Sequence, residues 1–423
     1  MKKFILSLSF IALITSFSFA KQNRVWSDRV FDINFGASAL CSNNILGLND
    51  LSTQVLVIDF TKIADKMKKN GQDANISAST ELQAGLRLDI PNGLTVGLTS
   101  GIQFYQSLNI GKELFYFLGY GNTLNQDIDI AINGFADVFV YNQVDFGWDF
   151  KKCKILVSPS IYSAFLHATT EGSHLTTRNT NDGKFAYELE GIASLYTSFE
   201  PSDYMFHDFI LYNMEFGFEA SSDYLRKLYL NSGLDVEANV EYFLNKDISL
   251  LGSVKMPFVP SKLSYKTQMK VTSQWETTII DAAQGNMTTP EIEYENLSEA
   301  SRVTYRLNRP LKIGVGADFH PWNNLMSYYG TLGLCVEHPF APSWDDVDFY
   351  IDYLFGLRIS ILNALNLNVS TQRIDKVFCQ KMAVGVNLRL IEVNVGLASA
   401  STDFVSSFSQ SGLNAFFDFH LGL

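Results

Sequence analysis

The chain is 423 residues long and carries a formal net charge of −12, with 18% charged residues against about 25% in typical soluble domains. This length allows two or three ordinary soluble domains or one large all-β domain. The acidic balance argues against nucleic acid as a partner, because binding nucleic acid requires clustered Lys and Arg.

The first twenty residues have the three-part pattern of a cleavable export signal. Lys2 and Lys3 precede an apolar stretch from Phe4 to Phe17, and Ser18-Phe19-Ala20 offers small residues at the two positions that a signal peptidase reads. The apolar run is short for a membrane-spanning helix, and no stop-transfer charges follow it. We therefore expect cleavage before Lys21, which would leave a mature chain of charge −14 because two lysines are lost.

The segment from 21 to 77 is expected to hold a first strand and a hatch-like helix. Alternating apolar residues begin at Phe31, and the stretch VIDFTKIADKMKKNG from Val57 has its apolar residues at helical spacing, with Asn70-Gly71 as a C-cap. A second short helix is expected within 110–122. These helices could lie on the surface, or they could pack inside or across the mouth of a barrel, since wide barrels are commonly plugged.

From residue 78 to 423 the recurring feature is a strict alternation of apolar and polar residues, with a period of two. In the stretch from Leu82 to Ile102, apolar residues alternate with polar residues and glycines on both sides of a Pro91-Asn92-Gly93 turn. The same alternation recurs near 138–150, 155–165, 234–242, 250–258, 311–319, 347–359, 365–369, 384–388, 391–397 and 413–423. We count roughly fourteen to sixteen such segments of about nine to thirteen residues, the length that a tilted strand needs to cross a bilayer.

The connections between these segments alternate in length. Short turns at 91–93, 151–153 and 245–247 are interleaved with segments that we expect to be long polar loops, above all Ala168 to Lys184 and Glu276 to Arg302. Short turns at one rim and long loops at the other are the usual asymmetry of outer-membrane barrels.

Alternation alone also fits a soluble sandwich in which one face of each sheet is exposed to solvent, so a secreted β-sandwich or solenoid is the alternative. The strands are, however, longer than the five or six residues or so of ordinary sheets, and aromatics such as Trp148, Tyr328 and Tyr329 stand near strand ends, as at a membrane interface. In hydrocarbon, spanning strands must close on themselves to pair every backbone polar group. We therefore predict an all-β fold: a closed antiparallel transmembrane β-barrel of about 14 (14–16) strands with a small N-terminal helical plug.

Motifs for chemistry are not found in this sequence. The six histidines form no HxH or HExxH spacing, no GxSxG or P-loop occurs, and the four cysteines lack CxxC spacing. We expect no enzyme activity, no metal and no cofactor. The polar residues of the alternating strands are instead predicted to face a lumen. They are Glu81, Gln83, Arg87, Asp89, Asp235, Glu237, Asn239 and Glu241. Such charges either pair with each other or with a plug, or set solute selectivity.

The organisation of the chain resembles FadL-like outer-membrane proteins, the class of long-chain fatty-acid transporters and related barrels. The resemblance rests on the signal peptide, an irregular segment with a helix at 39–73, about fourteen strands, and an aromatic-rich last strand with Phe417 and Phe419. Members of that family carry an Asn-Pro-Ala element in the N-terminal hatch, where this chain reads Ser42-Asn43-Asn44-Ile45. The chain also ends in Leu423 where outer-membrane barrels usually end in an aromatic residue.

The resemblance implies passive uptake of hydrophobic, fatty-acid-like solutes across a bacterial outer membrane, with membrane lipid as the surrounding partner. An apolar passage would then be formed by Phe60, Ile63, Met67, Phe115 and Phe117, although each of these residues could equally serve only in packing. Two alternatives stay open at this point. One is a general diffusion porin with a water-filled lumen, and the other is an outer-membrane assembly partner or adhesin that presents the long loops.

Overall fold

A computed structural model of the chain describes residues 30–45, 59–71, 73–90, 93–121, 125–180, 184–200, 226, 229–278, 291–321, 325–340, 347–362, 364–408 and 412–422. The expected signal peptide and the first two residues of the Pro91-Asn92-Gly93 turn lie outside these ranges. Within them, no helix is both long and apolar enough to cross a membrane.

The described residues are almost entirely strands. These are β1 (Phe31–Asn43), β2 (Ala74–Ile90), β3 (Leu94–Ile110), β4 (Asp127–Asp149), β5 (Cys153–Asn179), β6 (Lys184–Thr197), β7 (Gly233–Phe243), β8 (Ile248–Val259), β9 (Ser261–Thr278), β10 (Glu291–Leu307), β11 (Leu311–Phe319), β12 (Met326–Glu337), β13 (Asp348–Ile361), β14 (Leu365–Ile374), β15 (Val377–Asn387), β16 (Ile391–Ser401) and β17 (Leu413–Gly422). Two α-helices, α3 (Phe60–Asn70) and α4 (Glu113–Tyr120), and the 3₁₀ turn η2 (Ser406–Phe408) accompany them.

The strand pairings close a ring. Going around it, the described strands follow the order β1, β2, β3, β4, β5, β7, β8, β11, β12, β13, β14, β15, β16 and β17, and β17 pairs with β1 again. Every one of these pairings is antiparallel. The prediction of an all-β, closed antiparallel barrel is therefore confirmed, and the whole sheet contains seventeen described strands.

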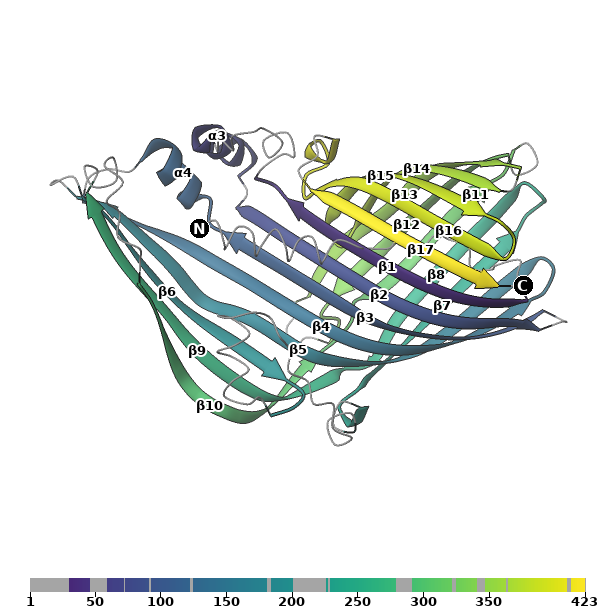
Figure 1. Ribbon diagram of the computed structural model, residues 1–423, viewed down its shortest axis with the longest axis horizontal. Coiled ribbons are helices and arrows are strands. Elements are labelled where there is room, and N and C mark those ends of the chain that lie inside the picture. The colour runs from purple at the N-terminus through teal and green to yellow at the C-terminus, as the bar shows by residue number, and fades with distance from the viewer. Residues whose placement is uncertain are drawn as a thin grey trace.

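The three remaining strands leave the ring because β5 forks. The first half of β5 pairs with β7 over Cys153–Tyr162, whereas its second half pairs with β6 over Leu166–Asn179. From there β6 pairs with β9, and β9 pairs with β10. We call this extension the wing, defined as β6, β9 and β10 together with residues 127–139 of β4 and 166–179 of β5. It forms the lower left of Figure 1, away from the short turns of the ring.

The wing corrects one expectation from the sequence. Ala168 to Lys184 and Glu276 to Arg302 were predicted to be long polar loops, but their described residues belong mostly to β5, β6, β9 and β10. The prediction was wrong because the wing strands carry polar residues, many of them threonines, where a period of two would show apolar ones. Thr is nevertheless a strong strand former, and the ladder of backbone hydrogen bonds forms regardless of which face is wet.

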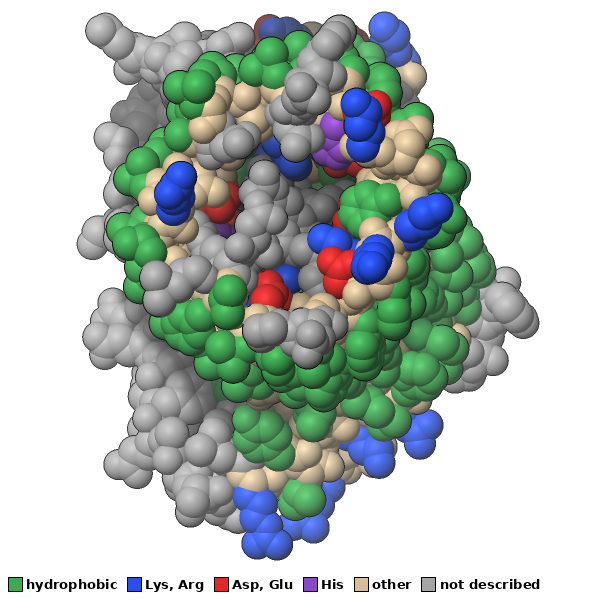
Figure 2. Space-filling view, turned by 90° about the vertical axis from the view of Figure 1, so that its right-hand side faces the viewer, with side chains coloured by type: hydrophobic (Ala, Val, Ile, Leu, Met, Phe, Trp, Pro, Cys, Tyr) green, Lys and Arg blue, Asp and Glu red, His purple; other side chains and the backbone are tan. Residues whose placement is uncertain are grey.

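The ring turns its apolar side chains outward. On β2, Leu82, Leu86, Leu88 and Ile90 are exposed, while the residues between them are half-buried. The same outward exposure is found for Ile33 and Phe35 on β1, Leu98 and Ile102 on β3, Ile313 and Val315 on β11, Val384 and Val386 on β15, and Val395 and Leu397 on β16. Figure 2 shows this apolar surface around an opening that contains charged side chains. An apolar exterior around a polar interior is the inverse of a soluble fold and fits a lipid environment.

The wing also carries charged side chains on its inner face, and these are exposed. There, exposed ion pairs join neighbouring strands: Asp127 with Arg178, Glu190 with Lys270 at 2.5 Å, and Glu276 with Lys184 at 2.5 Å. A hydrogen bond of 3.0 Å joins His174 and Asp129 in the same way. Charged groups at such exposure are costly in hydrocarbon. The wing therefore extends beyond the apolar belt of the ring.

The two helices have the predicted local signals. The side chain of Asp59 caps α3 by accepting a hydrogen bond from the backbone N–H of Lys62 at 3.0 Å, and Gly71 ends the helix in the left-handed conformation with φ 67°. Glycine adopts this conformation without steric cost. The C-cap expected at Asn70-Gly71 is thereby confirmed, as is a short helix within 110–122.

A charge introduced on the outer face should impair the fold, whereas one on the inner face should not. We expect Leu86→Arg to lower the free energy of unfolding by about 2–4 kcal/mol if this residue lies near the bilayer midplane, because its side chain is 41% exposed on the apolar face. Gln83→Arg, three residues away on the opposite, half-buried face of β2, is the matched control. Urea unfolding in lipid vesicles measures both, and equal destabilisation by the two variants would contradict the assigned parity.

The ion pairs of the wing give its stability a pH dependence. Hydrogen bonds from Arg178 and Lys270 lower the pKa of Asp127 and Glu190, respectively. Carboxylates with lowered pKa stabilise the folded state above their unfolded pKa of about 4, and this contribution is lost as the pH falls through the folded pKa. We expect amide hydrogen exchange in the wing to accelerate, relative to the ring, between pH 7 and about pH 3. Equal relative protection at both pH values would contradict this.

Candidate transport path

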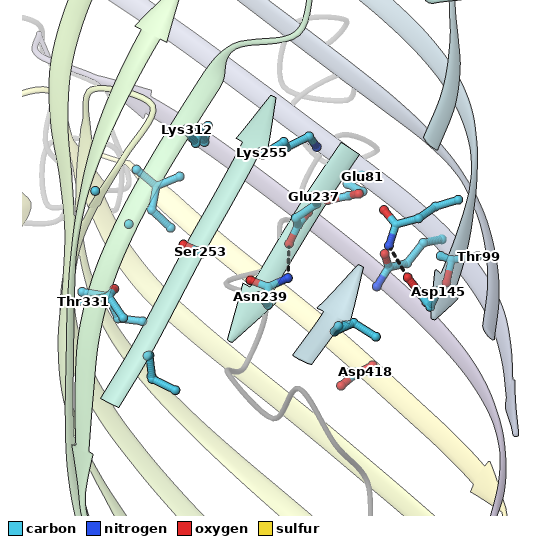
Figure 3. A pocket seen from close by; sticks show the side chains of 18 of the residues that line it. Glu81, Thr99, Asp145, Glu237, Asn239, Ser253, Lys255, Lys312, Thr331 and Asp418 are labelled. Carbon is cyan, nitrogen blue, oxygen red and sulfur yellow. Dashed lines mark hydrogen bonds between the residues drawn. The ribbon is translucent and has the colours of Figure 1, made fainter. Parts of the chain in front are cut away.

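The ring encloses a cavity of about 1270 Å³. Its lining comes from strands all around the ring, and Figure 3 shows side chains that converge on it, among them Glu81, Asp145, Glu237, Lys255 and Asp418. The cavity lies inside the apolar belt, so any solute that crosses the belt within the protein would pass these groups.

Five of the eight lumen-facing residues predicted from the sequence line this cavity: Glu81, Gln83, Arg87, Glu237 and Asn239. The alternation of the strands accounts for their placement, since successive side chains point to opposite faces. Whether they select solutes stays a prediction.

The other three predicted residues lie on the same inner parity but are not part of the cavity lining. Asp89 accepts hydrogen bonds from Arg87 at 3.1 Å and from Thr95 at 2.5 Å. Glu241 is half-buried and lies opposite Lys154 in the β5–β7 ladder. Asp235 is buried in an ion pair that closes one end of the cavity, described below.

The lining is charged and well supplied with hydrogen-bonding groups. Glu81 accepts hydrogen bonds from the Tyr141 hydroxyl at 2.7 Å and from Gln103 at 2.9 Å. On the β1–β17 side, His420 lies between two carboxylates, with its Nδ1 2.8 Å from Asp32 and its Nε2 3.0 Å from Asp418. A surface of this kind is suited to water and polar solutes.

Towards the wing the cavity ends at a layer of aromatic side chains. Phe139, Tyr141 and Tyr162 are buried in one cluster with Tyr196 and Leu307. Glycines opposite them leave the room they need: a Cβ on Gly101 would lie 2.6 Å from the Tyr141 ring, and one on Gly233 would lie 2.5 Å from the Tyr162 ring. The two rings therefore lie over the paired glycines of the neighbouring strands, in space that a side chain would otherwise fill.

A buried cation joins this layer. Arg309 lies in the short link between β10 and β11, and its Nη1 is 3.1 Å from the Oδ2 of Asp235 on β7. Only 5% of the Arg309 side chain and 1% of the Asp235 side chain are exposed. The guanidinium carbon lies 4.7 Å from the centroid of Tyr141 and 5.0 Å from that of Tyr162, which is within the range of cation–π attraction.

The turn between β14 and β15 completes the layer. Its two central residues, Asp375 and Lys376, have φ values of 48° and 70°, which β-carbon-bearing residues adopt rarely. Asp375 accepts hydrogen bonds from Lys312 at 2.7 Å and from the Tyr350 hydroxyl at 3.0 Å. Asp375 also lines a small cavity together with Tyr105 of β3, so the turn reaches across the lumen towards the aromatic cluster.

This layer separates the cavity from the wing. Among the described residues, those that line the cavity come from the ring and the β10–β11 link, and β6, β9 and β10 contribute none. Sequence reasoning did not find the layer, although a signal was present. Phe139 and Tyr141 are large aromatic residues that alternate with Val138 and Val140 along β4. They therefore stand on the inner face of the strand, where polar residues were expected.

The predicted plug is not confirmed, because the described helices pack against each other at the rim of the ring. Ile63 and Met67 of α3 pack with Phe115 of α4, with Phe60 partly buried against them. Phe117 stacks on Phe185 of β6 at a centroid distance of 5.3 Å. Phe185 lies on the outer face of β6, because it alternates with Glu188 and Glu190 of the inner face. None of these five proposed passage residues lines the cavity, and both helices lie at the rim in Figure 1. Their apolar faces are buried against each other and the outer side of the sheet.

A closed antiparallel barrel with an apolar exterior and a charged lumen is the architecture of an integral outer-membrane β-barrel protein. No family model matches the sequence, and no curated protein matches it either.

Solved structures with similarity to the chain include FadL-like proteins, as its organisation predicts. The P. putida toluene transporter TodX has a TM-score of 0.46 and 8% identity, over 94% of this chain and 91% of that one. The Ralstonia pickettii toluene transporter TbuX has a TM-score of 0.43 and 7% identity, over 94% and 90%. A Pseudomonas aeruginosa FadL homologue has a TM-score of 0.38 and 6% identity, over 93% and 90%.

Filling the space that Gly233 leaves should disturb the aromatic layer. We expect Gly233→Val to lower the free energy of unfolding by about 1–3 kcal/mol, as overpacking typically does, because the new side chain would meet the Tyr162 ring and the backbone of Val259. Gly252→Val is the matched control, since a Cβ at Gly252 meets nothing within 4 Å. Denaturant unfolding that showed equal effects would contradict the close approach of Tyr162.

Proposed function

We propose that the protein is a passive diffusion channel of the bacterial outer membrane for small polar solutes. The observation that carries this proposal is the cavity of about 1270 Å³ inside the ring, with its charged and hydrogen-bonding lining. Glu81, Asp145 and Lys255 would keep water and polar solutes in the lumen at little cost, whereas an apolar solute would gain nothing by leaving lipid for it.

The orientation follows from the two ends of the ring. The short turns would face the periplasm, and the wing would extend outward from the cell. Lipid would contact the exposed apolar residues of the ring, such as Leu86 and Ile102. A solute would meet the inner face of the wing first, pass the aromatic layer, and cross the charged cavity.

Liposome swelling tests this function directly. Vesicles that contain the purified full-length protein should swell in an isosmotic sugar solution, and planar bilayers should show discrete conductance steps. Vesicles with heat-denatured protein are the control. A protein that shifts its gel mobility on boiling, as a folded barrel does, yet gives neither swelling nor conductance would contradict a diffusion channel.

A second candidate, uptake of hydrophobic or fatty-acid-like solutes, is favoured by the aromatic side chains on the wing side of the layer. Tyr305 stacks on His167 at a centroid distance of 4.9 Å, and Tyr196 lies 4.4 Å from Tyr305. Such rings could receive an apolar chain before it leaves the barrel, on a route that does not use the proposed pocket at α3 and α4.

Deletion of the gene distinguishes the second candidate. Loss of long-chain fatty-acid uptake, restored by the wild-type protein and not by a Tyr305→Ala variant, would support it. Unchanged uptake in the deletion strain would contradict it and leave the diffusion channel or an assembly or adhesin role. Uptake of a small sugar, measured in the same strains, is the control for general permeability.

A further inference from the structure

We infer that the Arg309–Asp235 ion pair is the gate of the channel, and that Lys255 is the second cation to which Asp235 transfers when the gate opens. This inference rests on the proposed diffusion function. It concerns a place in the lumen where one buried carboxylate lies within reach of two cations.

The position of Arg309 is the first argument. The residue lines the cavity at its wing end and at the same time lies against the rings of Tyr141 and Tyr162. Removal of the guanidinium from this place would take away the centre of the layer. A side-chain rotation into the adjoining cavity needs no movement of the ring strands, because the cavity already offers the space.

The incomplete hydrogen bonding of the pair is the second argument. Within the described part of the chain, the Nε and Nη2 of Arg309 and the Oδ1 of Asp235 are buried without a hydrogen-bond partner. Buried charges are held firmly only when their remaining donors and acceptors are also satisfied. The closed state is therefore less favourable than its burial suggests, and hydration of Arg309 in the lumen would offset the loss of the ion pair.

The second cation is the third argument. The Nζ of Lys255 on β8 lies 4.0 Å from the Oδ2 of Asp235, the same oxygen that faces Arg309. A buried carboxylate left alone would be strongly destabilising, but here Lys255 remains beside it when Arg309 departs. Two arrangements of one charge set, Asp235–Arg309 and Asp235–Lys255, give the two discrete states that a gate requires.

The link to the wing is the last argument. Leu307 belongs to the aromatic cluster, Arg309 forms the ion pair, and Lys312 holds Asp375 of the β14–β15 turn. One segment of six residues thus joins both halves of the closing layer to the end of β10. Release of Arg309 would loosen this segment as a whole.

Single-channel recording of three variants tests the gate, because two of them should act in opposite directions. Arg309→Gln removes the closing cation and should raise the open probability on the order of tenfold. Lys255→Gln removes the alternative partner and should lower the open probability below that of the wild type. Arg178→Gln is the matched control: this arginine also pairs with a carboxylate, that of Asp127, but it lies on the wing and is not part of the cavity lining.

The outcomes separate the gate from the channel. If the wild type conducts, and folded Arg309→Gln or Lys255→Gln has the same open probability as the wild type, the gate is wrong and the channel stands. If the wild type and all variants show heat-modifiable folding but no conductance, the proposed function itself is wrong. Should Arg309→Gln fail to fold, Lys255→Gln still decides, because its side chain is 23% exposed and an unchanged open probability would overturn the inference.

Discussion

The requirement that every backbone N–H and C=O inside hydrocarbon find a partner within the protein governs this structure. It forces the strands inside the apolar belt to pair until the last, β17, meets the first, β1. It also limits where the sheet may branch. β5 can exchange its neighbour β7 for β6 only where water is available to the strand edges that the branch creates, and the exposed ion pairs of the wing mark that region. The fork in β5 is thus a consequence of leaving the belt.

Closure of the ring fixes the character of its two faces. Since side chains alternate along each strand, an apolar outer face leaves the inner parity to polar groups, and the lumen of a ring this wide is not filled by side chains of ordinary length. The layer at the wing end is built from exceptions to that rule. Tyr141 and Tyr162 stand there in place of polar lumen residues, and the paired Gly101 and Gly233 leave room for their rings.

The sequence was sufficient to predict the elements whose pattern repeats locally. The alternation on β2 and β7 identified strands, their outer face and the inward side of residues such as Glu81 and Asn239. The strands of the wing were missed because polar residues stand on both faces there, as at the neighbouring Thr176 and Thr177 of β5, so that no hydrophobic alternation marks the strand. The helix α3 was predicted with its cap, but amphipathicity reveals only that a face is buried and does not reveal what covers it.

The polar centre gives the closing layer two arrangements of similar free energy, which a purely apolar layer would not have. Aromatic rings packed only on one another would hold the lumen shut by dispersion and by the exclusion of water, with no second arrangement of similar free energy. A buried carboxylate shared by Arg309 and Lys255 has two such arrangements, and an exchange between them keeps one cation beside Asp235 throughout. Asp235 is therefore never left as an isolated buried charge, which would be so costly, and the hydration of the departing arginine decides which state prevails.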